Sequence, residues 1–102
     1  MLPFSGIMTA PDVATVRLLA FAGARDAIGA AEVELPWSEV IAASTDRRPT
    51  ADALLGLACA RWPALAPYRA CLRVAVNGSY AAAVDPVAAG DEVALIPPVA
   101  GG

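Results

Sequence analysis

The residues best suited to chemistry are the last two, Gly101 and Gly102, which follow the run Pro97-Pro98-Val99-Ala100. Glycine has no Cβ, so this end can lie extended in a channel too narrow for side chains, with its carboxylate unshielded. The two prolines fix φ and remove two backbone donors, which stiffens the approach. Residues 97–102 can reach about 20 Å when extended. The pattern predicts an end that is inserted into a partner enzyme and reacts through the Gly102 carboxylate.

The composition argues against an enzyme that acts alone. The 102 residues include no histidine and no lysine, so the chain lacks the commonest general base, the usual Schiff-base nucleophile and the commonest metal ligand. Cys59 and Cys71 cannot complete a four-ligand zinc site, and we predict that both are small buried side chains in a reduced protein. We therefore expect no metal site. The net charge of −3, with Arg47-Arg48 as the only adjacent basic pair, argues against nucleic-acid binding.

The length predicts one domain that needs no disulfide or metal. We divide it into an N-terminal extension (1–14), a folded domain (15–96) and a flexible tail (97–102). The apolar residues at the start are interrupted by Pro3, Ser5 and Pro11, so they form neither a signal peptide nor a membrane span. We expect a cytoplasmic protein without membrane contact.

Five segments have the composition and alternation of strands. The first places Val16, Leu18 and Ala20 on one face, and Asn77-Gly78 is a strong signal for a type I′ hairpin turn. The predicted strands are Thr15–Ala22, Glu32–Leu35, Leu72–Val76, a strand from about Tyr80, and Glu92–Ile96.

One main helix is predicted from about Ala51 to Arg61, with Thr50 as its N-cap and Pro63 after its end. Its apolar stripe consists of Leu54, Leu55, Ala58, Cys59 and Trp62. Trp37–Pro49 is open between a short helix around Glu39–Ala43 and an irregular insertion. Ala24–Gly29 is predicted as a single helical turn, and Ala64–Ala70 as a short helical turn or loop.

This order of elements indicates an α+β fold, in which a mixed sheet of about five strands is crossed by one main helix. The first and last strands can lie parallel and adjacent, because a long crossover connects them. That arrangement is a β-grasp. The helix covers only one face of the sheet, and the other face carries Leu19, Phe21, Ala75, Ala94 and Ile96. This second face is either a docking surface or a consequence of an alanine-rich composition.

Several motifs resemble the small subunit of molybdopterin synthase, a ubiquitin-like sulfur-carrier family. The segment Phe21–Gly29 is similar to that family's A-R-x-x-x-G stretch after the first strand. Val76-Asn77-Gly78, Gly90–Ala94 and Pro97–Gly102 resemble its V-N, G-D-E-V-A and P-P-V-x-G-G segments in order and spacing. The resemblance covers residues from about 15 to 102, and the Trp37–Pro49 segment is longer than the family's usual connection.

The resemblance implies a sulfur-carrier subunit that binds no cofactor itself. A ubiquitin-activating-like adenylyltransferase would use ATP to adenylate the Gly102 carboxylate, and sulfur would then displace AMP to give a thiocarboxylate. That group would donate sulfur to a pterin precursor held by the large catalytic subunit, in a heterotetramer of two small and two large subunits. Gly102 alone would change covalently.

The remaining site residues are expected to contact partners. They are Phe21, Arg25, Ile96, Pro97, Pro98, Val99, Ala100 and Gly101. Arg25 and its neighbour Asp26 are otherwise an ordinary solvated pair. Asp91 and Glu92 could meet the activating enzyme, although Gly90-Asp91 is also a good turn.

Three other functions stay open. The thiocarboxylate could supply thiamine synthesis, cysteine synthesis or tRNA thiolation instead. The chain could be a ubiquitin-like protein modifier that forms isopeptide bonds through Gly102, or a structural β-grasp module whose tail has no role.

Overall fold

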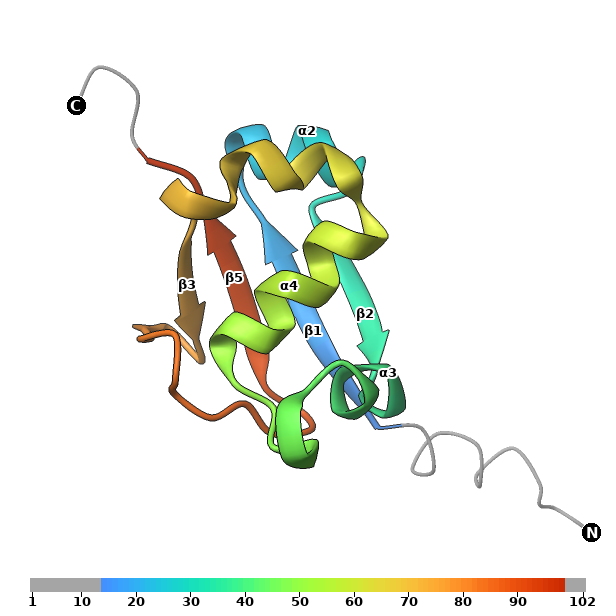
Figure 1. Ribbon diagram of the computed structural model, residues 1–102. Coiled ribbons are helices and arrows are strands. Elements are labelled where there is room, and N and C mark those ends of the chain that lie inside the picture. Colours follow the sequence, from blue (N-terminus) through green and yellow to red (C-terminus); the bar gives the residue numbers. More distant parts are fainter. Residues whose placement is uncertain (1–13, 99–102) are drawn as a thin grey trace, which may run out of the picture.

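A computed structural model describes residues 14–98, so residues 1–13 and 99–102 lie outside the description. The core of the fold is a five-stranded sheet in the order β2-β1-β5-β3-β4, crossed on one face by the helix α4 (Figure 1). The strands are β1 (Thr15–Ala20), β2 (Glu32–Pro36), β3 (Arg73–Val76), β4 (Ser79–Tyr80) and β5 (Glu92–Ile96). The predicted α+β β-grasp fold is confirmed.

The first and last strands are parallel neighbours in the middle of the sheet. Arg17 lies opposite Glu92 and Leu19 opposite Ala94, while β1–β2, β5–β3 and β3–β4 are antiparallel pairs. Because β1 and β5 run in the same direction, Ala14 and Pro98 lie at opposite ends of the sheet (Figure 1).

The helix α4 (Ala51–Arg61) has the predicted bounds, and neighbouring groups satisfy the free N–H groups of its first turn. The Ala53 N–H donates to Thr50 Oγ1 at 3.1 Å, as expected for an N-cap. The Ala51 and Asp52 N–H groups donate to the carbonyl oxygens of Asp85 and Ala83. The loop before β5 therefore holds the start of the helix.

The core lies between α4 and the sheet. Val16, Leu18 and Ala20 of β1 face it as predicted, together with Val93 and Leu95 of β5. Four of the five predicted stripe residues of α4 are buried, and Trp62 is half-buried. No polar or charged side chain among residues 14–98 is buried.

The connections are more helical than the sequence indicated. The predicted single turn after β1 is a seven-residue helix, α2 (Ala22–Ile28). The open segment 37–49 contains α3 (Trp37–Ala42) and the 3-10 turn η1 (Thr45–Arg47). The predicted short turn at 64–70 is the nine-residue 3-10 segment η2 (Pro63–Cys71).

The prediction that both cysteines are buried is half wrong. Cys59 is buried on α4, but Cys71 is exposed at the end of η2, where its thiol donates to the Tyr68 carbonyl oxygen at 3.3 Å. The helical segment carries Cys71 past the edge of the core before Leu72 turns back into it. No helix in the described part of the chain is long and apolar enough to cross a membrane.

Candidate functional site

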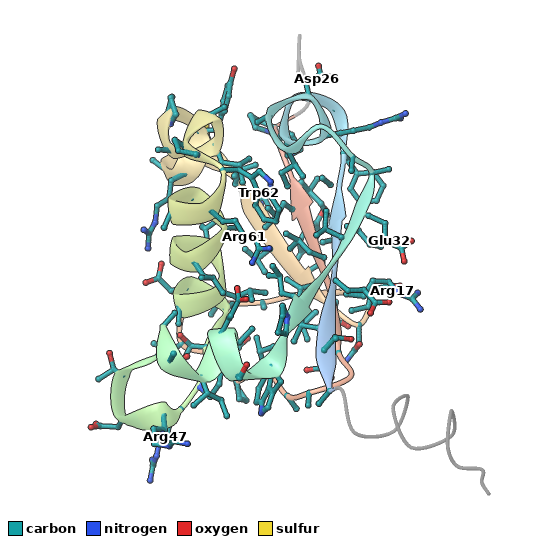
Figure 2. The ribbon with its side chains drawn as sticks, turned by 90° about the vertical axis from the view of Figure 1, so that its right-hand side faces the viewer. Arg17, Asp26, Glu32, Arg47, Arg61 and Trp62 are labelled. Carbon is teal, nitrogen blue, oxygen red and sulfur yellow. The ribbon has the colours of Figure 1, made fainter. Side chains whose placement is uncertain are left out.

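The face of the sheet turned away from α4 is divided into a charged end and an apolar end. The charged end lies near the start of β1, where Arg17 pairs with Glu32 and Glu92, each at 3.3 Å. Figure 2 shows Arg17 and Glu32 projecting from this face. The register then places Leu19, Ala94, Ala75 and Tyr80 in one row across four strands. The apolar end is the end from which β5 leads into the C-terminal tail.

A hollow of about 270 Å³ lies at this apolar end. Its walls are Phe21, Ala75, Gly78, Tyr80, Ala94 and Ile96. Phe21 is 48% exposed and Tyr80 is 65% exposed, while the alanines form the floor. The Arg73 guanidinium lies 4.6 Å from the centre of the Tyr80 ring, which adds a cationic edge. The hollow can receive an apolar side chain of a partner between two aromatic rings.

An unusual turn places Phe21 at this hollow. Phe21 is extended, and Ala22, the first residue of α2, has φ of 48°. Few residues other than glycine adopt this left-handed region. The Phe21 N–H donates to the Leu95 carbonyl oxygen at 3.4 Å, which ties the turn to the end of β5. Phe21 and Arg25 also line a second hollow of about 280 Å³ on the other side of the turn.

The structure brings together three of the predicted partner-binding residues around the base of the tail. Phe21 shares one hollow with Arg25 and the other with Ile96, and Pro97 and Pro98 follow directly. Pro97 is half-buried and Pro98 is exposed. The other predicted site residues, Val99, Ala100, Gly101 and Gly102, lie outside the described residues, and so does the predicted flexibility of the chain there.

Partner contacts were also considered for Asp91, Glu92, Arg25 and Asp26, and these residues differ in the contacts that they make within the domain. Asp91 accepts hydrogen bonds from Asn77 Nδ2 at 3.0 Å and from the Ala88 N–H at 2.8 Å. These hydrogen bonds stabilise the turn before β5. Glu92 belongs to the Arg17 ion pairs. Arg25 and Asp26 are exposed on α2, and no ion pair joins either of them to another residue within 14–98.

The carboxylates of residues 14–98 are at the surface, and no group of three or more potential metal ligands occurs among these residues. Burial raises the pKa of the Cys59 thiol, and the nearby Arg69 guanidinium partly opposes this.

Tyr80 is the site residue that sequence reasoning missed. A two-residue Asn77-Gly78 turn fixes the pairing of the flanking strands. Val76 then faces Ser79, and Ala75 faces Tyr80. Because Ala75 was already assigned to the open face, the same register would have placed Tyr80 beside it.

Comparison with known proteins now identifies the family. A family model described as the ThiS family matches residues 19–102. The chain belongs to the ThiS family. The matched region includes the apolar end of the open face and the terminal diglycine. The resemblance to ubiquitin-like sulfur carriers that the sequence motifs suggested is confirmed.

Relatives of this ThiS-family chain include proteins with two kinds of name. A "Molybdopterin synthase sulfur carrier subunit" from Aedes aegypti is 34% identical over 94 residues, which cover 89% of this chain and 92% of the relative. The crystal structure of SAMP1 from Haloferax volcanii is 28% identical with a TM-score of 0.67, and the match covers 86% of this chain and 99% of that one. A putative molybdopterin converting factor, subunit 1, from Pyrococcus furiosus has a TM-score of 0.66 at 23% identity, over 84% and 99% of the two chains, and it supports the fold alone.

Proposed function

We propose that this chain is the sulfur-carrier subunit of a molybdopterin synthase. The observation that carries the proposal is the apolar hollow of Phe21, Tyr80 and Ile96 at the point where β5 leads into the diglycine tail. A docking surface beside a reactive end lets one partner hold the domain while the tail enters that partner's active site. The 34% identical relative with this name supports the choice of pathway.

The chemistry takes place on the carboxylate of Gly102. A carboxylate is a poor electrophile because oxide would have to leave. An adenylyltransferase therefore joins a carboxylate oxygen to the α-phosphorus of ATP and releases pyrophosphate. A sulfide-level nucleophile then attacks the acyl carbon, and AMP leaves with the C–O bond electrons. The product is a thiocarboxylate, a soft anionic nucleophile.

The thiocarboxylate sulfur attacks a carbon of a pterin precursor on the large catalytic subunit and displaces an oxygen substituent of that carbon, which leaves with the electrons of its C–O bond. Hydrolysis of the acyl–sulfur bond returns the Gly102 carboxylate, and two rounds supply both sulfurs of the dithiolene that binds molybdenum or tungsten. The small chain binds no cofactor in this scheme. The partner supplies the bases and cations, which agrees with the lack of histidine and lysine here. The working assembly is a heterotetramer with two copies of each subunit, in the cytoplasm.

The domain contributes by docking. Phe21, Ile96 and Tyr80 provide apolar area on both sides of the tail's origin, and Arg25 and Arg73 provide charge at its edges. Aromatic and arginine side chains are the commonest sources of binding energy at protein interfaces. Pro97 and Pro98 have restricted φ angles, which stiffen the start of the tail.

A second candidate is a ubiquitin-like protein modifier. The structural similarity to SAMP1, a small archaeal modifier protein, favours it. A modifier would pass the same acyl-adenylate to a lysine amine on a target and form an isopeptide bond. This chain has no lysine, so it could not form chains on its own side chains.

The deciding experiment incubates the protein with a cognate adenylyltransferase, ATP and a sulfur source, followed by intact-mass measurement. The expected product is heavier by the difference between one sulfur and one oxygen atom. Addition of a pterin-binding large subunit and precursor should return the original mass and form the dithiolene. No mass change with an active cognate enzyme would refute the proposal. Isopeptide adducts on lysines without sulfur transfer would favour the modifier.

A further inference from the structure

Two parts of the chain that the β-grasp sheet does not require meet at one place. One is the connection from α3 through η1, and the other is the chain that precedes β1. A hollow of about 620 Å³ lies between them, lined by Ala14, Pro36, Trp37, Ser38, Ile41, Ala42 and Arg47. Its volume is in the range of pockets that receive ligands of drug size. The helix α3, which supplies much of this wall, lies at the opposite end of the sheet from Pro98 (Figure 1).

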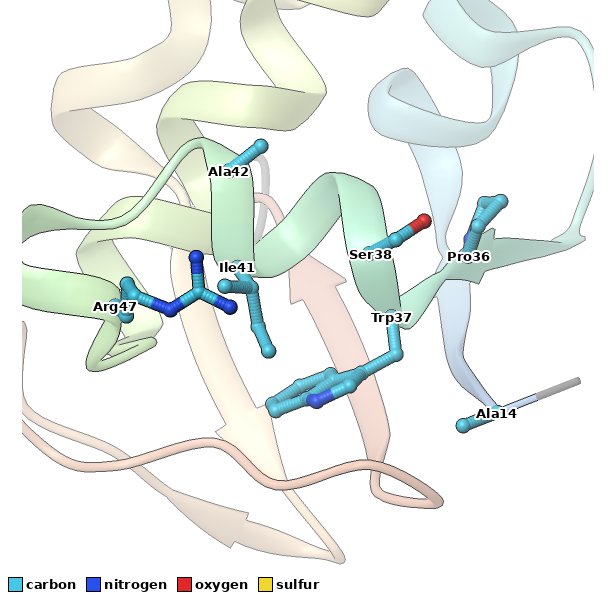
Figure 3. Close-up of a pocket in the computed structure, with 7 residues that line it drawn as sticks. All are labelled: Ala14, Pro36, Trp37, Ser38, Ile41, Ala42 and Arg47. Atoms are coloured by element: carbon cyan, nitrogen blue, oxygen red, sulfur yellow. The ribbon is translucent and has the colours of Figure 1, made fainter.

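The wall of the hollow is mainly apolar with one cationic edge. Figure 3 shows Ile41 between the Trp37 indole and the Arg47 guanidinium. Trp37 and Ile41 are only half-buried, although the indole packs partly against the core. Asp46 and Arg47 have φ angles of 55° and 56°. These left-handed conformations are costly for residues other than glycine.

The described chain begins at the edge of this hollow. Ala14 is one of the lining residues, and its carbonyl oxygen accepts a hydrogen bond from the Trp37 N–H at 2.9 Å. The thirteen residues before it could span about 43 Å when extended, which is ample for a return across α3. The thirteen residues before Ala14 are therefore long enough to reach Trp37 and the rest of the hollow.

The composition of residues 1–13 complements this wall. The segment has five large apolar side chains, Leu2, Phe4, Ile7, Met8 and Val13, besides Met1. Its one charged side chain, Asp12, is opposite in sign to Arg47. A segment this apolar gains from leaving water, and tethering makes its local concentration near the hollow high.

We propose that residues 1–13 dock in this hollow, with apolar side chains against Trp37 and Ile41 and with Asp12 beside Arg47. The chain would then cover this hollow itself and leave the open face of the sheet free for partners. The inference is independent of the proposed function.

The test uses Trp37 fluorescence in the full-length chain. Trp62 is the only other tryptophan, so a Trp62→Phe background makes Trp37 the single reporter. In that background we compare the parent with a Phe4→Ser/Ile7→Ser variant. The matched control is Val84→Ser, which removes an apolar side chain that is 79% exposed elsewhere.

Docking predicts that Phe4→Ser/Ile7→Ser shifts Trp37 emission to the red and increases quenching by acrylamide, whereas Val84→Ser changes neither. Each lost apolar contact should shift the docking equilibrium by about tenfold. Nuclear Overhauser contacts between Ile41 methyl groups and residues 1–13 should be present in the parent and independent of protein concentration.

Three results would overturn the proposal. One is identical Trp37 quenching in the parent and the double variant, with no contacts to Ile41. Another is protection of Trp37 that grows with protein concentration, since a second copy would then fill the hollow. The third is protection that occurs only after a partner protein is added. If Trp62→Phe unfolds the chain, the contacts to Ile41 measured without it decide the question.

Discussion

At the residue scale, the most unusual backbone conformation in the site is that of Ala22. Its φ of 48° turns the chain from β1 into α2 and presents Phe21 to the hollow. An alanine in the left-handed region costs roughly 1 kcal/mol relative to its ordinary conformation. Such strain is retained where the surrounding contacts fix the turn, and here the Phe21 N–H bond to Leu95 is one of them.

Ala22→Gly should therefore stabilise the fold. Glycine adopts this φ without a Cβ clash, but it loses more conformational entropy on folding, so we expect a net gain of up to about 0.5 kcal/mol in the free energy of unfolding. Urea denaturation monitored by circular dichroism measures it. Gly23→Ala is the comparison at an unstrained position of α2, where a Cβ meets nothing within 4 Å and φ is not positive. There alanine should be more stable than glycine, the reverse of position 22. A loss of stability on Ala22→Gly would mean that the turn is not strained in solution.

Cys59 makes stability depend on pH. Burial raises the pKa of the folded thiol, while the unfolded thiol titrates near its ordinary value of about 8.5. The contribution of the protonated Cys59 thiol to the free energy of unfolding is therefore fully present below the pKa of the unfolded thiol. It is lost as pH rises toward the folded pKa, because the unfolded chain releases a proton that the folded chain keeps. Unfolding free energy should fall more between pH 7 and about pH 9.5 in the parent than in Cys59→Ala. An equal fall in the unfolding free energy of the parent and of Cys59→Ala, measured by urea denaturation at each pH, would contradict this.

At the element scale, α4 depends on its first turn. Thr50 Oγ1 caps the Ala53 N–H, and the loop at Ala83 and Asp85 accepts from two further N–H groups. Thr50→Ala removes one acceptor and should cost about 1 kcal/mol of unfolding free energy. Thr50→Ser retains the hydroxyl and should recover most of it. Chemical denaturation of both variants gives the comparison, and equal losses would assign the effect to the methyl group instead.

In the proposed function, the open face of the sheet docks the large subunit. Phe21→Ser should weaken binding to the large subunit by at least about tenfold, as expected for an aromatic residue at the centre of an interface. Folding should change by less than about 1 kcal/mol, since the ring is half exposed. Val84→Ser removes a more exposed apolar side chain outside this face and should leave the affinity unchanged. Calorimetric titration against the large subunit measures both variants. Equal affinities for the parent and Phe21→Ser would place the docking surface elsewhere.

At the scale of the whole molecule, sequence patterns predicted the sheet and the main helix because both depend on regular spacing. Alternation placed Val16, Leu18 and Ala20 in the core, and Thr50 marked the start of α4. The length of the 3-10 segment η2 was underestimated, because Pro67 interrupts the helical pattern in the sequence. In the structure, the packing of Leu65 in the core holds this segment in place. The prediction that Cys71 is buried was wrong for the same reason. The hollow of Phe21, Tyr80 and Ile96 joins residues from three strands and two turns, so only the register of the strands brings them together.

In the proposed function, a stable domain presents a reactive end. The buried core of the described residues lies between Val16 and Leu95. We expect a change at Gly102 to leave this core intact. Gly102→Val should leave the free energy of unfolding within about 0.5 kcal/mol of the parent. It should abolish thiocarboxylate formation, because a branched Cβ does not fit a channel made for glycine. Denaturation and intact mass after incubation with the adenylyltransferase measure the two properties on one sample. Undiminished thiocarboxylation of Gly102→Val would show that the enzyme does not require a bare terminal residue. A large fall in stability would show that the end contributes to the fold.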